Sequence, residues 1–350
     1  MRLRLFLILI AILIAPALRA ETGPAATLLV LSKQDRTLAL VDPATLRVLG
    51  RVPAGNDPHE VIAAPDGRTA YVSNYGFGAF HTITAIDLVS RKQSKTIDVL
   101  PLRGPHGLAF VQGKLWFTAE VAKCIARYDP ATGKVDWVMG TGQNRTHMLY
   151  VFQDARRIVT TNVNSGTVLI LDRVDAKGGL PAAGATAVAG YPPGAILPPG
   201  GDWLPTVVHV GTRDEGFDVS PDGKEAWVAN AGDGTVSVVD LRAKRVTATL
   251  QVNVRSANRL KFTPDGRRVL ISMLNGPDVV VVDTTTHAVV RRIAVGHGSA
   301  GILMEPDGAR AFVSCTPDGY VAVIDLKTLA VVGHIEAGGG PDGLAWAVRR

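Results

Sequence analysis

FDVSPDGKEAWVAN, residues 217–230, is one of six related stretches in this chain of 350 residues. Three further copies match it closely and two are more divergent; they are VIAAPDGRTAYVSN (61–74), LKFTPDGRRVLISM (260–273), ILMEPDGARAFVSC (302–315), LAFVQGKLWFTA (108–119) and LYVFQDARRIVTTN (149–162). Each copy is followed by an alternating apolar run that ends in an aspartate, and a seventh, partial unit ends at Asp42; the other six are Asp87, Asp129, Asp172, Asp240, Asp283 and Asp325. Successive aspartates are 42 to 45 residues apart, except for one step of 68. A repeat of this length is typical of the blades of a β-propeller.

Each full unit contains four short β-rich runs, separated by the Gly, Pro, Asn and Asp residues that favour turns. In the unit quoted first, the runs cover residues 217–223, 225–230, 235–241 and 245–252. Such a unit predicts a four-stranded antiparallel blade.

The two ends of the chain complete each other in this pattern. The first unit has only three runs, whereas the chain ends with an extra run, LAWAVRR (344–350). We therefore predict an all-β protein, a seven-bladed β-propeller of four-stranded antiparallel blades in a single domain over residues 27–350. The C-terminal strand should join the N-terminal blade and close the ring, which leaves no exposed sheet edge at the closure.

The repeats resemble the YVTN-type, YncE-like β-propeller family over residues 27–350. The family's namesake letters appear here as YVSN (71–74), VTTN (159–162) and WVAN (227–230). The resemblance implies the propeller fold. For function it implies several classes, because that family and its propeller relatives include binding scaffolds, lactone hydrolases and subunits of quinoprotein dehydrogenases.

The N-terminus has the form of a secretory signal. Arg2 and Arg4 precede an apolar run that is followed by small residues, so we expect residues 1–20 to be a signal peptide cleaved after Ala17 or Ala20. We accordingly predict a periplasmic or extracellular protein, a monomer, with no transmembrane segment in the mature chain. The formal net charge of +6 falls to +3 after Ala20, which argues against a nucleic-acid partner.

Three further features stand apart from the regular repeat. Residues 174–206 form an insertion in the fourth unit that is rich in Pro, Gly and Ala and predicts a loop. Cys124 and Cys315 belong to blades far apart in the ring, so we predict two free thiols. DPATGKVDW (129–137) resembles one tryptophan-docking repeat of pyrroloquinoline-quinone propellers, but it occurs once, and we interpret it as a turn with Trp137 packed between blades.

The first strand of each blade is expected to run along the central channel, so the residues at its start surround one mouth of that channel. At this position, which we call the ring position, the seven units carry His59, His106, His147, Glu215, Asn258, Ala300 and Asp342. The loop after the second strand reaches the same mouth and brings Asn74, Glu120, Asn162 and Asn230, with Arg145, Arg213, Arg255 and Arg259 nearby. One face of the ring therefore collects imidazole, carboxylate, amide and guanidinium groups.

Three histidines from consecutive blades, with a carboxylate beside them, provide the donor types of a divalent metal site. We predict His59, His106, His147 and Glu215 as ligands of zinc, copper or calcium, and no other cofactor is identified. Asn74, Glu120, Asn162, Asn230, Asn258 and Asp342 are predicted as ligand-binding residues. The alternative for each residue is a structural role, in which it hydrogen-bonds the neighbouring blade or ordered water.

Three functions fit these residues. The leading hypothesis is an exported binding propeller that presents the mouth to a small ligand, a metal or a protein partner. The second is a metal-assisted hydrolase or lyase of the lactonase-like type, in which Asp342 would accept a proton. The third is an accessory protein of a quinoprotein oxidation system. The chain has no C-x-x-C-H or G-x-S-x-G motif, so the sequence leaves open whether it is an enzyme.

Overall fold

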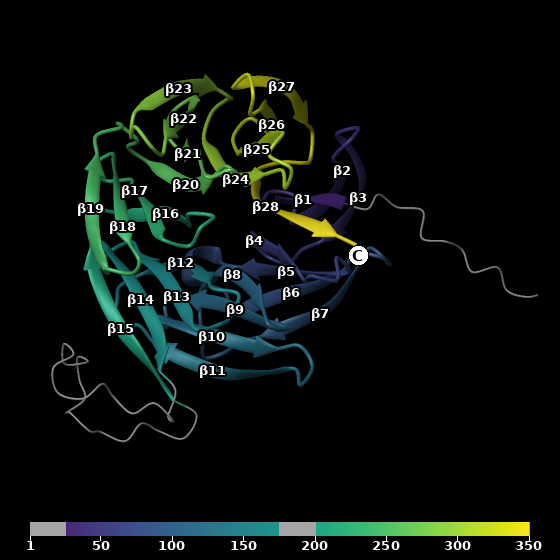
Figure 1. Cartoon of the computed structure of the whole chain (residues 1–350). Helices are drawn as coiled ribbons and strands as arrows, with labels where there is room; N and C mark the ends of the chain where they lie inside the picture. The colour runs from purple at the N-terminus through teal and green to yellow at the C-terminus, as the bar shows by residue number, and fades with distance from the viewer. Residues whose placement is uncertain (1–25, 175–200, 350) are drawn as a thin grey trace, which may run out of the picture.

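The computed structural model describes residues 26–174 and 201–349. In this part the chain forms seven four-stranded antiparallel sheets that surround a central channel as the blades of a ring (Figure 1). The predicted seven-bladed propeller is thereby confirmed. The predicted signal peptide, residues 1–20, and most of the predicted insertion lie outside the described residues.

The four strands of each blade follow one another from the channel outward. Blade one contains β28 (Pro341–Val348), β1 (Ala26–Ser32), β2 (Thr37–Asp42) and β3 (Arg47–Pro53). Blade two contains β4 (Pro58–Ala63), β5 (Thr69–Asn74), β6 (Thr82–Asp87) and β7 (Lys92–Asp98), with a short 3-10 turn η1 (Gly76–Gly78) after β5. Blade three contains β8 (Pro105–Val111), β9 (Lys114–Ala119), β10 (Cys124–Asp129) and β11 (Lys134–Gly140). Blade four contains β12 (Thr146–Val151), β13 (Arg157–Asn162), β14 (Thr167–Val174) and β15 (Asp202–His209).

The remaining blades have the same order. Blade five contains β16 (Asp214–Val219), β17 (Glu225–Asn230), β18 (Thr235–Asp240) and β19 (Arg245–Leu250). Blade six contains β20 (Ala257–Phe262), β21 (Arg268–Met273), β22 (Asp278–Asp283) and β23 (Val289–Ala294). Blade seven contains β24 (Ser299–Met304), β25 (Arg310–Cys315), β26 (Tyr320–Asp325) and β27 (Ala330–Ile335).

The PDG letters of the repeat build the turn between the first and second strands of a blade. In blade five, Gly223 has a φ of 72°, a conformation that residues with a Cβ rarely adopt. The carboxylate of Asp222 accepts a hydrogen bond from the backbone N of Lys224 at 3.2 Å. Each PDG turn therefore carries its own stabilising contact.

The apolar core lies between neighbouring blades. At the interface of blades five and six, for example, Trp227 and Val238 pack in one cluster with Leu260 and Ile271, and all four are buried. Comparable clusters join the other neighbouring pairs around the ring. The alternation in each strand thus buries both faces of a blade, one against each neighbour.

The C-terminal strand closes the ring as predicted. β28 pairs antiparallel with β1, with Trp346 opposite Leu28 and Ala345 opposite Leu29, and the two strands lie side by side in Figure 1. The indole N–H of Trp346 donates to the carbonyl of Met304 in blade seven at 2.8 Å. The last strand is therefore bonded to the first blade and tied to the seventh.

The structure also places the three features that stand apart from the repeat. Cys124 and Cys315 are free and buried, as predicted. The ring centroid of Trp137, in the DPATGKVDW stretch, lies 5.3 Å from that of Trp116 in its own blade and 5.6 Å from that of Trp203 in blade four. Trp137 is therefore a packing residue between blades. The predicted loop 174–206 is too long: Val174 pairs with Asp202, and residues 202–206 belong to β15 because Trp203 is buried in that interface.

The described residues contain no helix with the length and hydropathy needed to span a bilayer.

Candidate functional site

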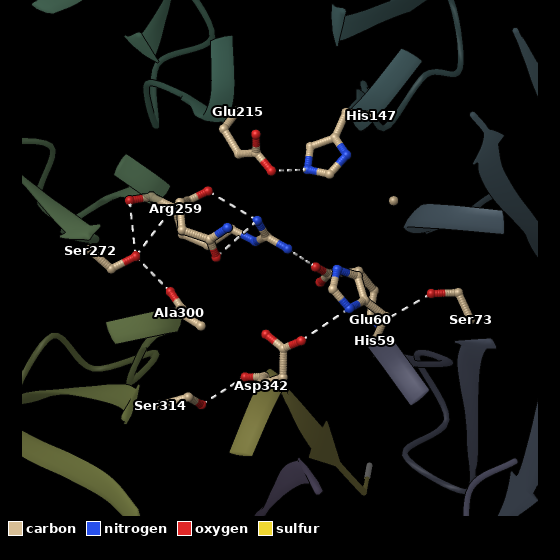
Figure 2. A network of polar contacts seen from close by, with 12 residues as sticks. His59, Glu60, Ser73, His147, Glu215, Arg259, Ser272, Ala300, Ser314 and Asp342 are labelled. Atoms are coloured by element: carbon tan, nitrogen blue, oxygen red, sulfur yellow. Dashed lines mark hydrogen bonds and ion pairs between the residues drawn. The ribbon is translucent and has the colours of Figure 1, made fainter. Parts of the chain in front are cut away.

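A β-bulge sets the direction of each ring residue. In β4 the pairing with β5 passes from Pro58 to Glu60 and leaves His59 outside the ladder. The same break occurs in the other inner strands, at His106, His147, Glu215, Asn258, Ala300 and Asp342. A bulge re-aims the side chain that it releases. His59, His147, Glu215 and Asp342 consequently come together from four blades over the channel (Figure 2).

Hydroxyl groups of four second strands hold the bulge of the next blade in place. The acceptor is the carbonyl of a ring residue in the next blade, and the bonds are Thr118 to His147 at 2.6 Å, Thr161 to Glu215 at 3.3 Å, Ser272 to Ala300 at 2.6 Å and Ser314 to Asp342 at 2.7 Å. Blade five has Ala229 at this register, and there the Asn258 carbonyl instead accepts from Arg259 Nη1 at 3.0 Å. The residue at the third letter of repeats such as VTTN therefore positions the ring residue of the next blade.

His106 lies at the centre of three adjacent histidine rings. Its ring centroid is 4.5 Å from that of His59 and 3.8 Å from that of His147, and the Tyr75 ring lies 4.9 Å away. The side chain is fully buried, and neither Nδ1 nor Nε2 has a hydrogen-bond partner among the described residues. Burial, reinforced by the positive charge of His147 and His59, lowers the pKa of His106 well below 6.5. His106 is therefore a neutral imidazole whose nitrogens are not used by the protein.

His147 stands between two carboxylates. Its Nδ1 hydrogen-bonds Glu120, which also accepts from the Tyr75 hydroxyl. Its Nε2 lies 3.2 Å from Glu215 Oε1, although the two atoms are not oriented for a hydrogen bond. Burial opposes protonation of His147, but the charge of Glu215 and the bond to Glu120 outweigh it and raise the pKa of His147. Burial would raise the pKa of Glu215, but the positive charge of His147 lowers it to about 2.

His59 is oriented by Asp342 and Lys33. Nδ1 of His59 lies 3.1 Å from Asp342 Oδ2 and 2.6 Å from Lys33 Nζ. Nδ1 of His59 cannot donate to Asp342 and accept from Lys33 at the same time. When Nδ1 donates to Asp342, Lys33 is held by carboxylates instead, because its Nζ lies 3.3 Å from Asp342 and 3.5 Å from Asp57. Although Asp342 is buried, His59 and Lys33 keep the pKa of its carboxyl well below the usual value. Asp342 is thus a poor proton acceptor, contrary to the role predicted for it.

Two compact groups of metal-ligating side chains share His106. The donor atoms of His59, Glu60 and His106 lie within 4.8 Å of one another, and so do those of His106, Glu120 and His147. Ligand atoms around a tetrahedral zinc are about 3.4 Å apart, since the bonds to the metal are about 2.1 Å long. The four predicted ligands do not form one such group, because Glu215 contacts His147 alone among the histidines.

An ion pair crosses the channel beneath the mouth. Arg259 of blade six extends toward Glu60 of blade two, and Nη2 of the arginine pairs with the carboxylate (Figure 2). Arg259 is only 5% exposed. Both residues directly follow a ring position, where blades three, five, seven and one carry Gly107, Gly216, Gly301 and Gly343. The pair therefore joins opposite sides of the propeller.

A cavity of about 930 Å³ opens above this layer. Its lining includes the ring residues His59, His147, Glu215, Asn258, Ala300 and Asp342, together with Lys33, Tyr75, Phe77, Arg145, Arg213, Arg255 and Leu274. His106 lies directly behind the rings of His59, Tyr75 and His147. A molecule in the cavity would meet His59 and His147 first.

Only some of the predicted ligand-binding residues lie at the cavity. Asn258 and Asp342 line the cavity, and Glu120 lies behind it in contact with His147. Asn74, Asn162 and Asn230 are buried and do not line it. Their side-chain amides are used inside the blades; Asn74, for example, donates to the Ala54 carbonyl at 2.9 Å and accepts from Thr84 at 2.9 Å. We assign these three amides to the scaffold instead of a binding site, because their hydrogen-bonding capacity is already used.

Sequence reasoning missed Glu60 and Tyr75. Glu60 carries a weak signal, since a charged residue replaces the glycine found after the ring position in four of the blades. Tyr75 follows the aligned end of the second strand, and nothing in the repeat marks it. Asp214, buried beside Glu215, was also missed; burial raises the pKa of its carboxyl to about 7, and its Oδ1 has no partner in the described part of the chain.

Comparison with known proteins supports the fold. No protein-family model matches the chain, and no curated protein matches it by sequence. Among solved structures it is similar to a putative 6-phosphogluconolactonase from Bacteroides fragilis NCTC 9343, with a TM-score of 0.70, 16% identity, and coverage of 92% of this chain and 97% of that one.

Two further structures are similar at the same level. A functionally unknown protein from Desulfotomaculum acetoxidans DSM 771 gives a TM-score of 0.67 at 15% identity, covering 90% of this chain and 98% of that one. The dihydro-heme d1 dehydrogenase NirN in complex with DHE gives a TM-score of 0.62 at 15% identity, covering 93% and 76%. At these identities the likeness shows a shared β-propeller fold.

Proposed function

We propose that this protein is a binding propeller that holds a divalent transition-metal ion at the histidine cluster and admits a small molecule to the cavity above it. In this proposal His59, His106 and His147 supply imidazole nitrogens, and Glu60 and Glu120 supply carboxylate oxygens. The repeat letters YVSN, VTTN and WVAN support membership of the YVTN-type family, and residues 1–20 support export to the periplasm or the exterior.

The observation that carries the proposal is the state of His106. Both ring nitrogens are buried and have no partner within residues 26–174 and 201–349, and an unsatisfied buried polar group costs about 1 to 3 kcal/mol. Buried polar groups in proteins are nearly always paired, so two unpaired nitrogens in one ring require an explanation. A metal ion would satisfy one of them, and the low pKa of His106 means that no proton competes for it.

The surrounding residues fit a metal ligand shell. Metal-binding histidines commonly donate their second N–H to a carboxylate, which fixes the ring orientation. His59 has such a contact with Asp342, and the Nε2 atom of His147 lies 3.2 Å from Glu215. Because imidazole nitrogens dominate the donor set, zinc or copper fits better than calcium, which takes oxygen ligands.

Metal-assisted hydrolysis or lyase chemistry is the second candidate. It is favoured by one observation, that the cavity opens directly onto His59 and His147. A metal bound there would polarise a carbonyl or activate water. Asp342 would serve as a positioning residue for His59, because Lys33 and His59 stabilise its ionised form.

Zinc titration by calorimetry tests the proposal. We expect the wild type, stripped with a chelator and then titrated with Zn²⁺, to bind the ion, and His106→Phe and His106→Leu to bind it at least about 100-fold more weakly, at the upper end of the losses typical of altered metal shells. His297→Ala is the matched control, since His297 has a 77% exposed side chain and lies outside both groups. Equal zinc affinity in the wild type and both His106 variants would contradict the proposal.

A further inference from the structure

One backbone position of the mouth is left-handed in every blade. The residue two before each ring position has a positive φ, and the seven are Asp57 (48°), Gly104 (73°), Arg145 (60°), Arg213 (55°), Ser256 (61°), Gly298 (56°) and Gly340 (64°). This conformation suits glycine and strains residues that carry a Cβ. Arginines occupy it in blades four and five, although glycine stands there in three blades. A long cation at a strained position calls for a functional reason.

Arg145 and Arg213 differ in their partners. Arg145 pairs with Glu215, the ring residue of the following blade, at 3.4 Å. For Arg213 the ring residue of the following blade is Asn258, which carries no charge. In the part of the chain that the structure describes, the exposed Arg213 guanidinium makes no ion pair and no side-chain hydrogen bond. Arg213 therefore brings an uncompensated positive charge to the cavity wall.

Arg255 adds a second such charge. It lines the same cavity, and its Nη1 donates to the Gly232 carbonyl at 2.7 Å. Residues 26–174 and 201–349 offer it no carboxylate partner. By contrast, Lys33 and Arg145, the other cations of the lining, are both paired with carboxylates. The free positive charge of the cavity thus lies on one wall, formed by blades five and six.

An apolar surface adjoins these arginines. Leu274 lines the cavity with 46% of its surface exposed, and Ala257, Ala300 and Pro317 line it as well. A guanidinium fork recognises carboxylate and phosphate groups through paired hydrogen bonds. Cavities of this size hold drug-sized molecules, with a few polar groups that set orientation.

We infer that the cavity binds a small organic anion, with its carboxylate or phosphate group against Arg213 and Arg255 and its apolar part against Leu274 and Ala300. The inference rests on the proposed function, because it names the chemical class of the small molecule that the cavity admits. The anion site is on the wall formed by blades five and six, whereas the proposed metal ligands belong to blades two, three and four. The two sites can therefore be tested separately.

Calorimetric titration with benzoate, phenyl phosphate and benzamide tests the inference on the full protein. We expect benzoate or phenyl phosphate to bind at least about tenfold more tightly than neutral benzamide, and the tighter of the two anions identifies the preferred group. Arg213→Gly should weaken anion binding at least about tenfold without loss of stability, since glycine suits the left-handed backbone. Arg242→Ala, which removes one exposed charge in the turn between β18 and β19, should leave binding unchanged.

A second variant gives Arg213 the carboxylate partner that it lacks. Asn258→Glu places a carboxylate where Glu215 stands relative to Arg145, and it should abolish anion binding by neutralising Arg213. Benzamide binding as tightly as both anions, or anion binding that survives Arg213→Gly and Asn258→Glu unchanged, would overturn the inference. Anion binding retained in His106→Phe and in chelator would leave the inference standing even if zinc binding failed, so the two failures are distinguishable.

Discussion

The two ends of each blade share one backbone plan but use their side chains differently. At the turn end, one aspartate in each of four blades accepts a hydrogen bond from the backbone N two residues further on, at 2.8 to 3.2 Å. These aspartates are Asp66, Asp222, Asp265 and Asp307. At the mouth end the bulge is equally regular, yet the residues that it presents are imidazole, carboxylate, amide and methyl groups. Where one register keeps one residue type, that residue builds the blade; where the type varies over a constant backbone, the side chains are free to form a site.

The largest effect on stability that we expect of a single substitution concerns Glu60, which pairs with Arg259 beneath the mouth. Glu60→Ala should lower the free energy of unfolding by about 3 kcal/mol, because it leaves the buried Arg259 without its closest carboxylate. Urea denaturation measures the loss. The double variant Glu60→Met with Arg259→Met should recover most of it, since an apolar pair can replace a buried ion pair at little cost. A loss below about 0.5 kcal/mol for Glu60→Ala would show that the pair does not stabilise the ring.

We predict that Asp214, at the mouth, makes the free energy of unfolding depend on pH. Its pKa of about 7 in the folded protein exceeds the usual 3.8, so its contribution to stability is complete below pH 3.8 and is lost as the pH rises through 7. Asp214→Asn should therefore stabilise the chelator-treated protein by about 1 to 3 kcal/mol at pH 8, by removing a buried charge whose Oδ1 finds no partner among the residues that the structure describes. At pH 5 the gain should be clearly smaller, because the folded carboxyl is then mostly protonated and only the unfolded one is charged. Urea denaturation at both pH values checks this, and equal effects at pH 5 and pH 8 would contradict it.

The fold and the ring positions could be predicted from sequence because they follow from a repeat. The steps between aspartates define the blades, and alignment of the units places His59, His106 and His147 at one mouth. The pairing of Glu60 with Arg259 could not be predicted, since the two residues are 199 positions apart and belong to opposite blades. Nor could the burial of His106, which depends on how its neighbours' rings pack over it.

The amides show a second limit of the sequence. Asn74, Asn162 and Asn230 align at the mouth as the histidines do, but they turn into the blades and bond to strand residues. An aligned position fixes where the backbone goes. It does not fix whether a side chain faces the cavity or the scaffold, because that choice depends on which partners lie within hydrogen-bond reach.

The smallest effect on stability that we expect comes from a substitution at the turn end of blade five. Asp222→Ala removes the carboxylate that bonds Lys224 N and Ser220 Oγ, and it should destabilise the protein by about 1 kcal/mol. Zinc and benzoate affinities should not change, because the turn lies at the far end of the blade from the cavity. A change in either affinity, measured by calorimetry, would show that the two ends are coupled.

Thermal melting of His106→Phe, with chelator and with Zn²⁺, tests most directly whether the mouth serves binding rather than folding. Without metal, the variant should melt at or above the wild-type temperature, because phenylalanine keeps a buried ring and removes two nitrogens that have no partner within the described ranges. His106→Leu controls for the larger volume of phenylalanine. With Zn²⁺, the melting temperature of the wild type should rise and those of both variants should not. Variants that melt several degrees below the wild type in chelator, and are stabilised by Zn²⁺ as much as it is, would show that His106 is part of the scaffold.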